Sequence, residues 1–143
     1  MSESEFDARV RLALHEAYHP CGTFWNNKTG WSNNGLVQNH DPFPGRGGGD
    51  LIGCVMGLWI EVENKAKTGK LRELQKVRRE LVTKCGGLYV ECRELGFNFA
   101  GDFDQGFERV LIRIDIYIRD MFGLEVLDRI VAARKARKAR KAK

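Results

Sequence analysis

The chain has 143 residues, of which 43% are hydrophobic and 30% are charged. This length allows one domain with a substantial core and excludes two, and the composition is that of an ordinary soluble globular protein. No run of about eighteen apolar residues occurs, so the sequence predicts no contact with a membrane.

The net charge of +5 is concentrated at the C-terminus. Residues 134–143 carry seven Lys and Arg side chains, and the rest of the chain is slightly acidic. We interpret residues 132–143 as a basic tail, a detachable electrostatic arm that binds a polyanion. A frayed and solvated helix end is the alternative interpretation.

The cellular compartment is predicted from the N-terminal segment and the cysteines. The segment MSESEFDARV is acidic and polar, and it lacks the basic and apolar blocks of a signal peptide. The four cysteines are widely spaced, without a CxxC pair, which indicates reduced thiols. We therefore expect a cytoplasmic protein.

The first elements in chain order are a helix, a short strand and a long loop. Apolar residues spaced as on one helical face predict a helix from Glu3 to His15. The residues 23–25 form a short strand candidate. The segment 26–49 is a polar loop, which is either functional or merely tolerated at the surface. Its Lys28 and Arg46 suit contacts with a phosphate backbone.

A β-hairpin with an unusual charge cluster follows. Residues 51–56 are an apolar run, Gly57 marks a turn, and residues 58–65 alternate as a strand. Alternation places Trp59, Glu61, Glu63 and Lys65 on one face of that strand, close to Asp50 at the start of the hairpin. Burying such ionisable groups costs solvation energy, and a bound divalent metal would offset that cost.

A helix and a strand complete the predicted core. The helix runs from Lys70 or Leu71 to Lys84, with Gly86 after its end. Its expected apolar stripe, facing the core, is Leu71, Leu74, Val77, Leu81 and Val82. Residues 87–92 form the next strand. Residues 1–96 are thus predicted to be an α/β core, in which helices flank a small mixed β-sheet.

The segment 97–131 is harder to assign. Apolar residues alternate between Val110 and Ile118 as in a strand, but they also fit a helical stripe. We favour a helix over 104–122, broken at Gly123, and a second helix from Leu124 that runs into the tail. Such an apolar extension often buries its surface against a second subunit, so we regard dimerisation as its candidate role.

Asp50, Glu63 and Lys65 suit the hydrolysis of phosphodiester bonds. Mg²⁺ prefers carboxylate oxygens together with water and substrate oxygens, so two carboxylates from neighbouring strands suffice. Lys65 shares the face of Glu63 and can orient a water molecule or stabilise developing charge. The N-terminal helix could add a further carboxylate, with Glu3 the first candidate and Glu5 the second.

These residues resemble the core of the PD-(D/E)XK nuclease superfamily, and specifically its virus-type replication-repair nuclease (VRR-NUC) domain in small stand-alone phage forms. The matching positions run in order along the chain: Phe24–Gly30, Gly47, Asp50-Leu51-Ile52-Gly53, Glu63-Asn64-Lys65, Gly69, Gln75 and Gly86–Val90. The resemblance covers residues 3–93. Two departures are Gly49, where the family often has Pro, and the additional acid Glu61. A register that uses Glu61 as the ligand loses the lysine and the spacing to Gln75.

The resemblance implies a restriction-endonuclease-like core and a Mg²⁺- or Mn²⁺-dependent endonuclease for structured DNA, similar to Holliday-junction resolvases. It implies a homodimer, no organic cofactor, the host cytoplasm for phage-encoded members, and a catalytic role for Gln75 besides Asp50, Glu63 and Lys65. Basic residues must hold the DNA because the catalytic core is acidic. The candidates are Lys28, Arg46, Lys67, Lys70, Arg72, Lys76, Arg134, Lys135, Arg137 and Lys138.

Two alternatives stay open at this point. One is a DNA-binding or assembly protein that has the nuclease fold without catalysis. The other is a nicking, restriction-type or flap nuclease, because substrate choice depends on loop shape and dimer geometry, which the sequence does not specify.

Overall fold

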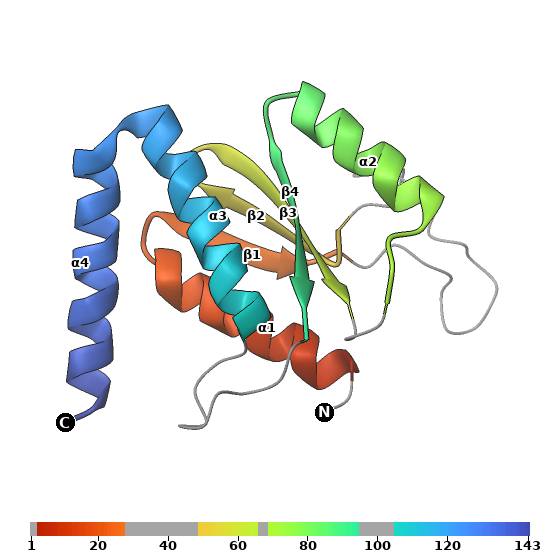
Figure 1. Cartoon of the computed structure of the whole chain (residues 1–143). Helices are drawn as coiled ribbons and strands as arrows, with labels where there is room; N and C mark the ends of the chain where they lie inside the picture. The colour runs from red at the N-terminus through yellow and green to blue at the C-terminus, as the bar shows by residue number, and fades with distance from the viewer. Residues whose placement is uncertain (1–2, 28–48, 66–68, 95–104) are drawn as a thin grey trace.

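The structure is a computed structural model that describes residues 3–27, 49–65, 69–94 and 105–143. Figure 1 shows a β-sheet with helices on both sides and a C-terminal helix at the edge of the molecule. No helix among the described residues is long and apolar enough to cross a membrane. The elements in chain order are α1 (Glu3–Tyr18), β1 (Gly22–Asn26), β2 (Leu51–Val55), β3 (Leu58–Lys65), α2 (Glu73–Lys84), β4 (Leu88–Arg93), α3 (Gln105–Phe122) and α4 (Leu124–Lys141).

The four strands form one mixed sheet in the order β1-β2-β3-β4. The first three pair in antiparallel fashion, and β4 pairs with β3 in parallel after the crossover through α2. Met56 and Gly57 have positive φ angles in the tight turn between β2 and β3, where Gly57 meets no steric penalty. These features confirm the predicted α/β class, a small mixed sheet flanked by helices with a C-terminal helical part.

The two faces of the sheet differ in chemistry because side chains alternate along each strand. Leu58, Ile60 and Val62 of β3 enter a hydrophobic core that they share with α1, β1, β2, β4, α3 and α4. The opposite face carries Glu61 and Glu63, and α2 lies over it. In Figure 1, β4 runs between α3 on one side and α2 on the other. One face of the sheet therefore packs in the hydrophobic core, and the opposite face holds buried carboxylates that α2 covers.

The segment with two possible periodicities is a helix, as predicted. Its buried residues include Phe107, Val110, Ile114 and Ile118. The last three are spaced by four, which satisfies both the strand period of two and a helical stripe, so the sequence pattern alone was ambiguous. Because α3 contributes to the same core as α1 and the sheet, the predicted C-terminal extension completes the core of this chain.

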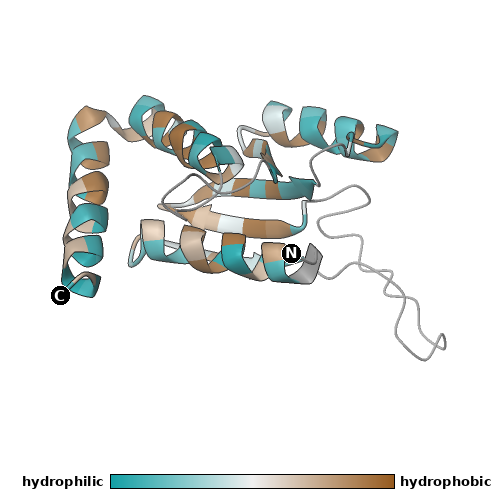
Figure 2. Ribbon diagram, turned by 60° about the horizontal axis from the view of Figure 1, so that its bottom comes forward, coloured by the Kyte–Doolittle hydropathy of each residue, from teal (hydrophilic) through white to brown (hydrophobic). Residues whose placement is uncertain are grey.

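The apolar stripe predicted for α2 is wrong in its orientation. Val82 is buried, but Leu74, Val77 and Leu81 are 54%, 61% and 49% exposed. Gln75 and Arg78 instead face the sheet, where their hydrogen-bond partners are the carboxylates of β3. The polar side of α2 therefore faces the charged face of the sheet. Figure 2 shows α2 as a largely hydrophilic helix.

The basic tail is not a separate arm, because α4 continues unbroken through Lys141. Arg134 and Arg137 donate hydrogen bonds to the backbone carbonyl of Ala17, and Arg137 also donates to that of Glu16. Lys141 pairs with the Glu16 side chain. The last carbonyls of a helix lack intrahelical partners and carry partial negative charge, so these cations cap the end of α1.

A polar network ties α1, α3 and α4 together beside this contact. Both terminal nitrogens of Arg134 lie 3.0 Å from the carboxylate of Asp115. The Tyr18 hydroxyl donates to Asp115 Oδ1 at 2.7 Å, and the Arg134 guanidinium lies over the Tyr18 ring. Burial and the neighbouring Asp115 raise the pKa of Tyr18, so the phenol stays a neutral donor.

Candidate active site

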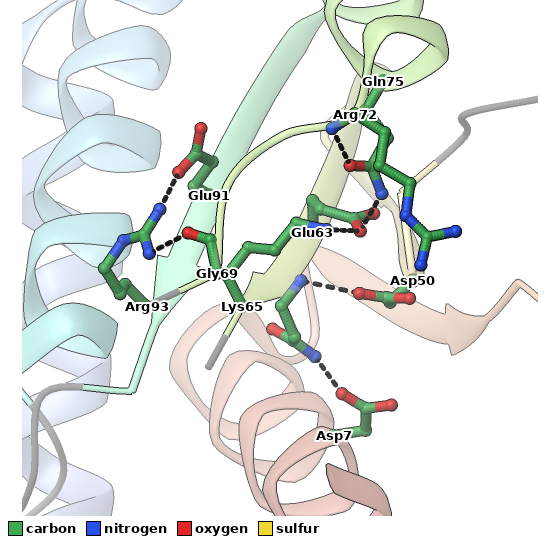
Figure 3. Close-up of polar contacts among 10 residues, drawn as sticks. Asp7, Asp50, Glu63, Lys65, Gly69, Arg72, Gln75, Glu91 and Arg93 are labelled. Atoms are coloured by element: carbon green, nitrogen blue, oxygen red, sulfur yellow. Dashed lines mark hydrogen bonds and ion pairs between the residues drawn. The ribbon is translucent and has the colours of Figure 1, made fainter. Parts of the chain in front are cut away.

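The hairpin register brings two carboxylates together at one end of the sheet. Leu51 of β2 is the partner of Val62 in β3, and the next step of the same register places Asp50 opposite Glu63. The backbone N–H of Asn64 donates to Asp50 Oδ2 at 2.7 Å, which orients that carboxylate (Figure 3). Two acids separated by twelve residues thus meet on neighbouring strand ends.

Glu63 is the centre of the cluster. It is 4% exposed, and its Oε1 atom accepts hydrogen bonds from Gln75 of α2 and from Lys65, whose Nζ atom lies 3.2 Å away. Its Oε2 atom is buried and has no hydrogen-bond partner among the described residues. The structure therefore brings the four predicted residues Asp50, Glu63, Lys65 and Gln75 together, as Figure 3 shows.

Negative charge is concentrated in this cluster. Burial and then the charge of Asp50 raise the pKa of Glu63 from its ordinary value of 4.5 to about 7, although Lys65 opposes the change. Burial, followed by the charge of Glu63, also raises the pKa of Tyr89, which lies on the adjacent strand β4. A cation between the two carboxylates would relieve the repulsion and lower the pKa of Glu63.

The donor set fits Mg²⁺ or Mn²⁺. Asp50 and Glu63 offer hard carboxylate oxygens, and Glu63 Oε2, which has no hydrogen-bond partner in the described part of the chain, is a buried acceptor that a cation could satisfy. Within the described ranges, no third His, Cys, Asp or Glu joins them to make a larger group. Mg²⁺ retains several waters and substrate oxygens in such sites, so two carboxylates are a sufficient protein contribution.

Among the described side chains of α1, the acidic residue Asp7 contacts this region. It accepts a hydrogen bond of 2.6 Å from the Asn64 side chain, so it holds the residue between Glu63 and Lys65. The sequence prediction named Glu3, whose side chain lies outside the described residues, and then Glu5, which is exposed. Asp7 comes four residues after Glu3, which places both on one face of a helix. This spacing in the sequence could have identified Asp7 as a candidate.

Arg93 was also missed, although the register places it beside Lys65. Its guanidinium donates to the backbone carbonyl of Gly69 and, at 2.9 Å, to the carboxylate of Glu91 (Figure 3). Arg93 thereby holds the segment that leads into α2 and Gln75. The parallel pairing of β3 and β4 creates this contact, and the sequence did not specify that register.

The predicted DNA-binding residues fall into three groups. Lys70, Arg72, Lys135 and Lys138 are exposed, and so is Lys76, which forms an ion pair with Glu73. Arg134 and Arg137 have partners within the protein, namely Asp115 and the backbone carbonyls at the end of α1. Lys28, Arg46 and Lys67 lie outside the described residues.

Comparison with protein-family models, curated proteins and solved structures returned no match to this chain.

Proposed function

We propose that this chain is a Mg²⁺- or Mn²⁺-dependent endodeoxyribonuclease that hydrolyses phosphodiester bonds in structured DNA. Like a Holliday-junction resolvase, it would act on four-way junctions. The observation that carries this proposal is the position of Asp50 opposite Glu63 on neighbouring strand ends. Lys65 and Gln75 both bond to the carboxylate of Glu63. Burying this cluster costs folding energy, so a catalytic role explains why the chain tolerates it.

Asp50 and Glu63 would hold the metal ion. When bound, such an ion lowers the pKa of water and offsets the charge that builds on the phosphate oxygens. Lys65, whose side chain is 14% exposed, can donate from Nζ to the attacking water or to a phosphate oxygen beside Glu63. Gln75 fixes Glu63 Oε1 through its side-chain amide, while its own carbonyl accepts from the Arg72 backbone at 2.8 Å.

DNA would be held by basic groups outside the acidic cluster. The exposed Lys70 and Arg72 precede α2 next to Gln75, and Lys135 and Lys138 project from α4. Contacts of this kind position the DNA backbone without reading the base sequence, as binding by DNA shape requires.

We also propose that the protein is a homodimer, because two opposed active sites would cut both strands of a junction. The molar mass in solution, measured by light scattering, tests this proposal.

A cleavage assay tests the proposal. We expect the protein with Mg²⁺ or Mn²⁺ to cut a four-way junction in preference to flap, duplex and single-stranded DNA. Asp50→Ala and Glu63→Ala should each abolish cutting. Cutting that survives both substitutions would refute this site. Preference for the flap would favour the flap nuclease, and DNA binding without any cutting would favour a non-catalytic binding protein.

Lys65→Met should separate metal binding from chemistry. The substitution keeps an unbranched side chain one atom shorter and leaves Asp50 and Glu63 in place, so Mn²⁺ binding should persist. Cleavage should fall by about 10²-fold because a charge-stabilising donor is lost. Titration of Mn²⁺ by electron paramagnetic resonance, together with single-turnover cleavage, measures the two effects. An unchanged cleavage rate would remove Lys65 from the mechanism.

A further inference from the structure

Glu61 is a fully buried carboxylate with a complete set of partners. It is 0% exposed, and both of its oxygens accept from Arg78 of α2, at 3.1 Å from Nε and 2.9 Å from Nη2. Trp59 Nε1 donates to Oε2 at 2.8 Å, and the backbone N–H of Gly49 donates to Oε1 at 3.1 Å. Glu61 thus has no oxygen left for a metal.

The bond to Gly49 connects Glu61 to Asp50, the next residue. The same short segment is held by the residue that follows β1, since Asn27 donates its side-chain N–H to the Gly49 carbonyl at 3.0 Å. The Asn27 backbone N–H donates to the Asp50 carbonyl at 2.9 Å. A Cβ atom at Gly49 would lie 2.9 Å from both the backbone nitrogen and oxygen of Val62, so only glycine allows this approach.

The bond to Arg78 connects Glu61 to Gln75. Residues three apart on a helix share a face, so Arg78 and Gln75 reach the sheet together. They bind Glu61 and Glu63, which are neighbours on one face of β3. The ion pair therefore sets how closely α2, and with it Gln75, approaches the strand that carries Glu63.

We infer that the Glu61–Arg78 ion pair is a positioning device that fixes Asp50 and Gln75 against Glu63 and thereby creates the metal site. The inference rests on the proposed function. The Glu61 carboxylate connects the three parts of the site. It belongs to β3, which carries Glu63, and it binds both the segment before β2, which carries Asp50, and α2, which carries Gln75. Residues that orient metal ligands from a second layer commonly change metal affinity by about 10- to 100-fold when they are removed.

The test separates positioning from simple stabilisation. Replacing both members of a buried ion pair by apolar residues often leaves stability unchanged or raised, whereas removing one member leaves a buried charge. We therefore compare the wild type with Glu61→Met/Arg78→Met and with the matched Asp115→Met/Arg134→Met. A third variant, Gly49→Ala, leaves the ion pair intact but forces the Asp50 segment away from β3.

For each protein, the thermal midpoint is measured in EDTA, the Mn²⁺ dissociation constant by electron paramagnetic resonance without DNA, and cleavage by single turnover. We expect Glu61→Met/Arg78→Met to retain the fold but bind Mn²⁺ about 10- to 100-fold more weakly. Gly49→Ala should show a comparable loss. The distant Asp115→Met/Arg134→Met should bind Mn²⁺ as the wild type does, whatever its midpoint.

Three results would overturn the inference. Wild-type Mn²⁺ affinity in Gly49→Ala and in a folded Glu61→Met/Arg78→Met variant would leave only a structural role for the pair, and the proposed function would stand. If Glu61→Met/Arg78→Met does not fold, the Mn²⁺ affinity of Gly49→Ala alone tests the inference. A wild-type affinity in Gly49→Ala would again overturn it. A wild-type protein that neither binds Mn²⁺ nor cuts DNA would refute the proposed function and the inference with it.

Discussion

Glu63→Gln is expected to reduce metal-dependent cleavage by at least about 10³-fold and, at the same time, to stabilise the metal-free protein above pH 7. The amide retains the shape of the side chain and an oxygen for the bonds from Gln75 and Lys65. It removes the negative charge that would hold the metal. It also removes the repulsion that Asp50 exerts on Glu63, which is one cause of the raised pKa.

The pH dependence of the stability effect follows from the direction of that pKa change. The folded protein holds the Glu63 proton up to about pH 7, whereas the unfolded chain loses it near the ordinary value of 4.5. Stability from this group is therefore lost as the pH rises between those values, and the loss stays constant above them. Glu63→Gln should raise the free energy of unfolding by about 1–2 kcal/mol at pH 8, allowing for solvent screening, and by little at pH 4.

Thermal unfolding in EDTA and in MnCl₂ between pH 4 and pH 8 measures this prediction. Mn²⁺ should stabilise the wild type, because only the folded state has the site, and should leave Glu63→Gln unaffected. The control is Glu125→Gln, which changes an exposed carboxylate of α4 that pairs with Arg129, away from the site. Cleavage by this control should stay within about threefold of the wild type. A stability gain for Glu63→Gln that does not depend on pH would contradict the electrostatic explanation.

The parts of the fold that depend on local patterns could be predicted from the sequence. Alternation along Leu58–Lys65 and the turn at Gly57 defined the hairpin, and its register then determined that Asp50 and Glu63 meet. Gln75 could be included only through the resemblance to a nuclease family. The structure independently places its amide on Glu63, which is a contact that spacing within one helix cannot specify.

The errors have a common physical origin, because each concerns a polar group whose partner lies on another element. The α2 stripe was assigned by hydrophobicity, but the buried charges of Glu61 and Glu63 attract Arg78 and Gln75 to the inner face. Glu61 was treated only as an additional acid beside the expected ligand Glu63, since nothing in the sequence shows that it binds Gly49. The tail was treated as a free polyelectrolyte because its α1 contacts, like that of Asp7 with Asn64, are tertiary.

The geometry of α4 divides the tail charges into two sets with different expected effects. The repeated Arg-Lys-Ala triplet turns by about 60° per repeat around a helix, so equivalent residues point in different directions. Arg134, Arg137 and Lys141 face α1 and bind its C-terminal end or the neighbouring Asp115. The other set is exposed and has no ion pair within the part of the chain that the structure describes; it consists of Lys135, Lys138, Arg140 and Lys143.

Arg134→Met and a quadruple Gln variant of the exposed set should therefore have opposite effects. Arg134→Met leaves Asp115, whose side chain is 17% exposed, without its cation, and should cost about 2–4 kcal/mol of folding free energy with little change in DNA affinity per folded molecule. The quadruple variant should unfold at the wild-type temperature. Its plot of log affinity against log salt should flatten by about 0.9 for each phosphate that the tail no longer neutralises. Denaturant unfolding and fluorescence anisotropy over a salt series measure these two quantities.

Deletion of residues 134–143 should combine both effects, so a truncated protein that binds weakly shows nothing about charge until its stability is known. A quadruple variant with an unchanged salt slope would show that α4 serves the fold alone.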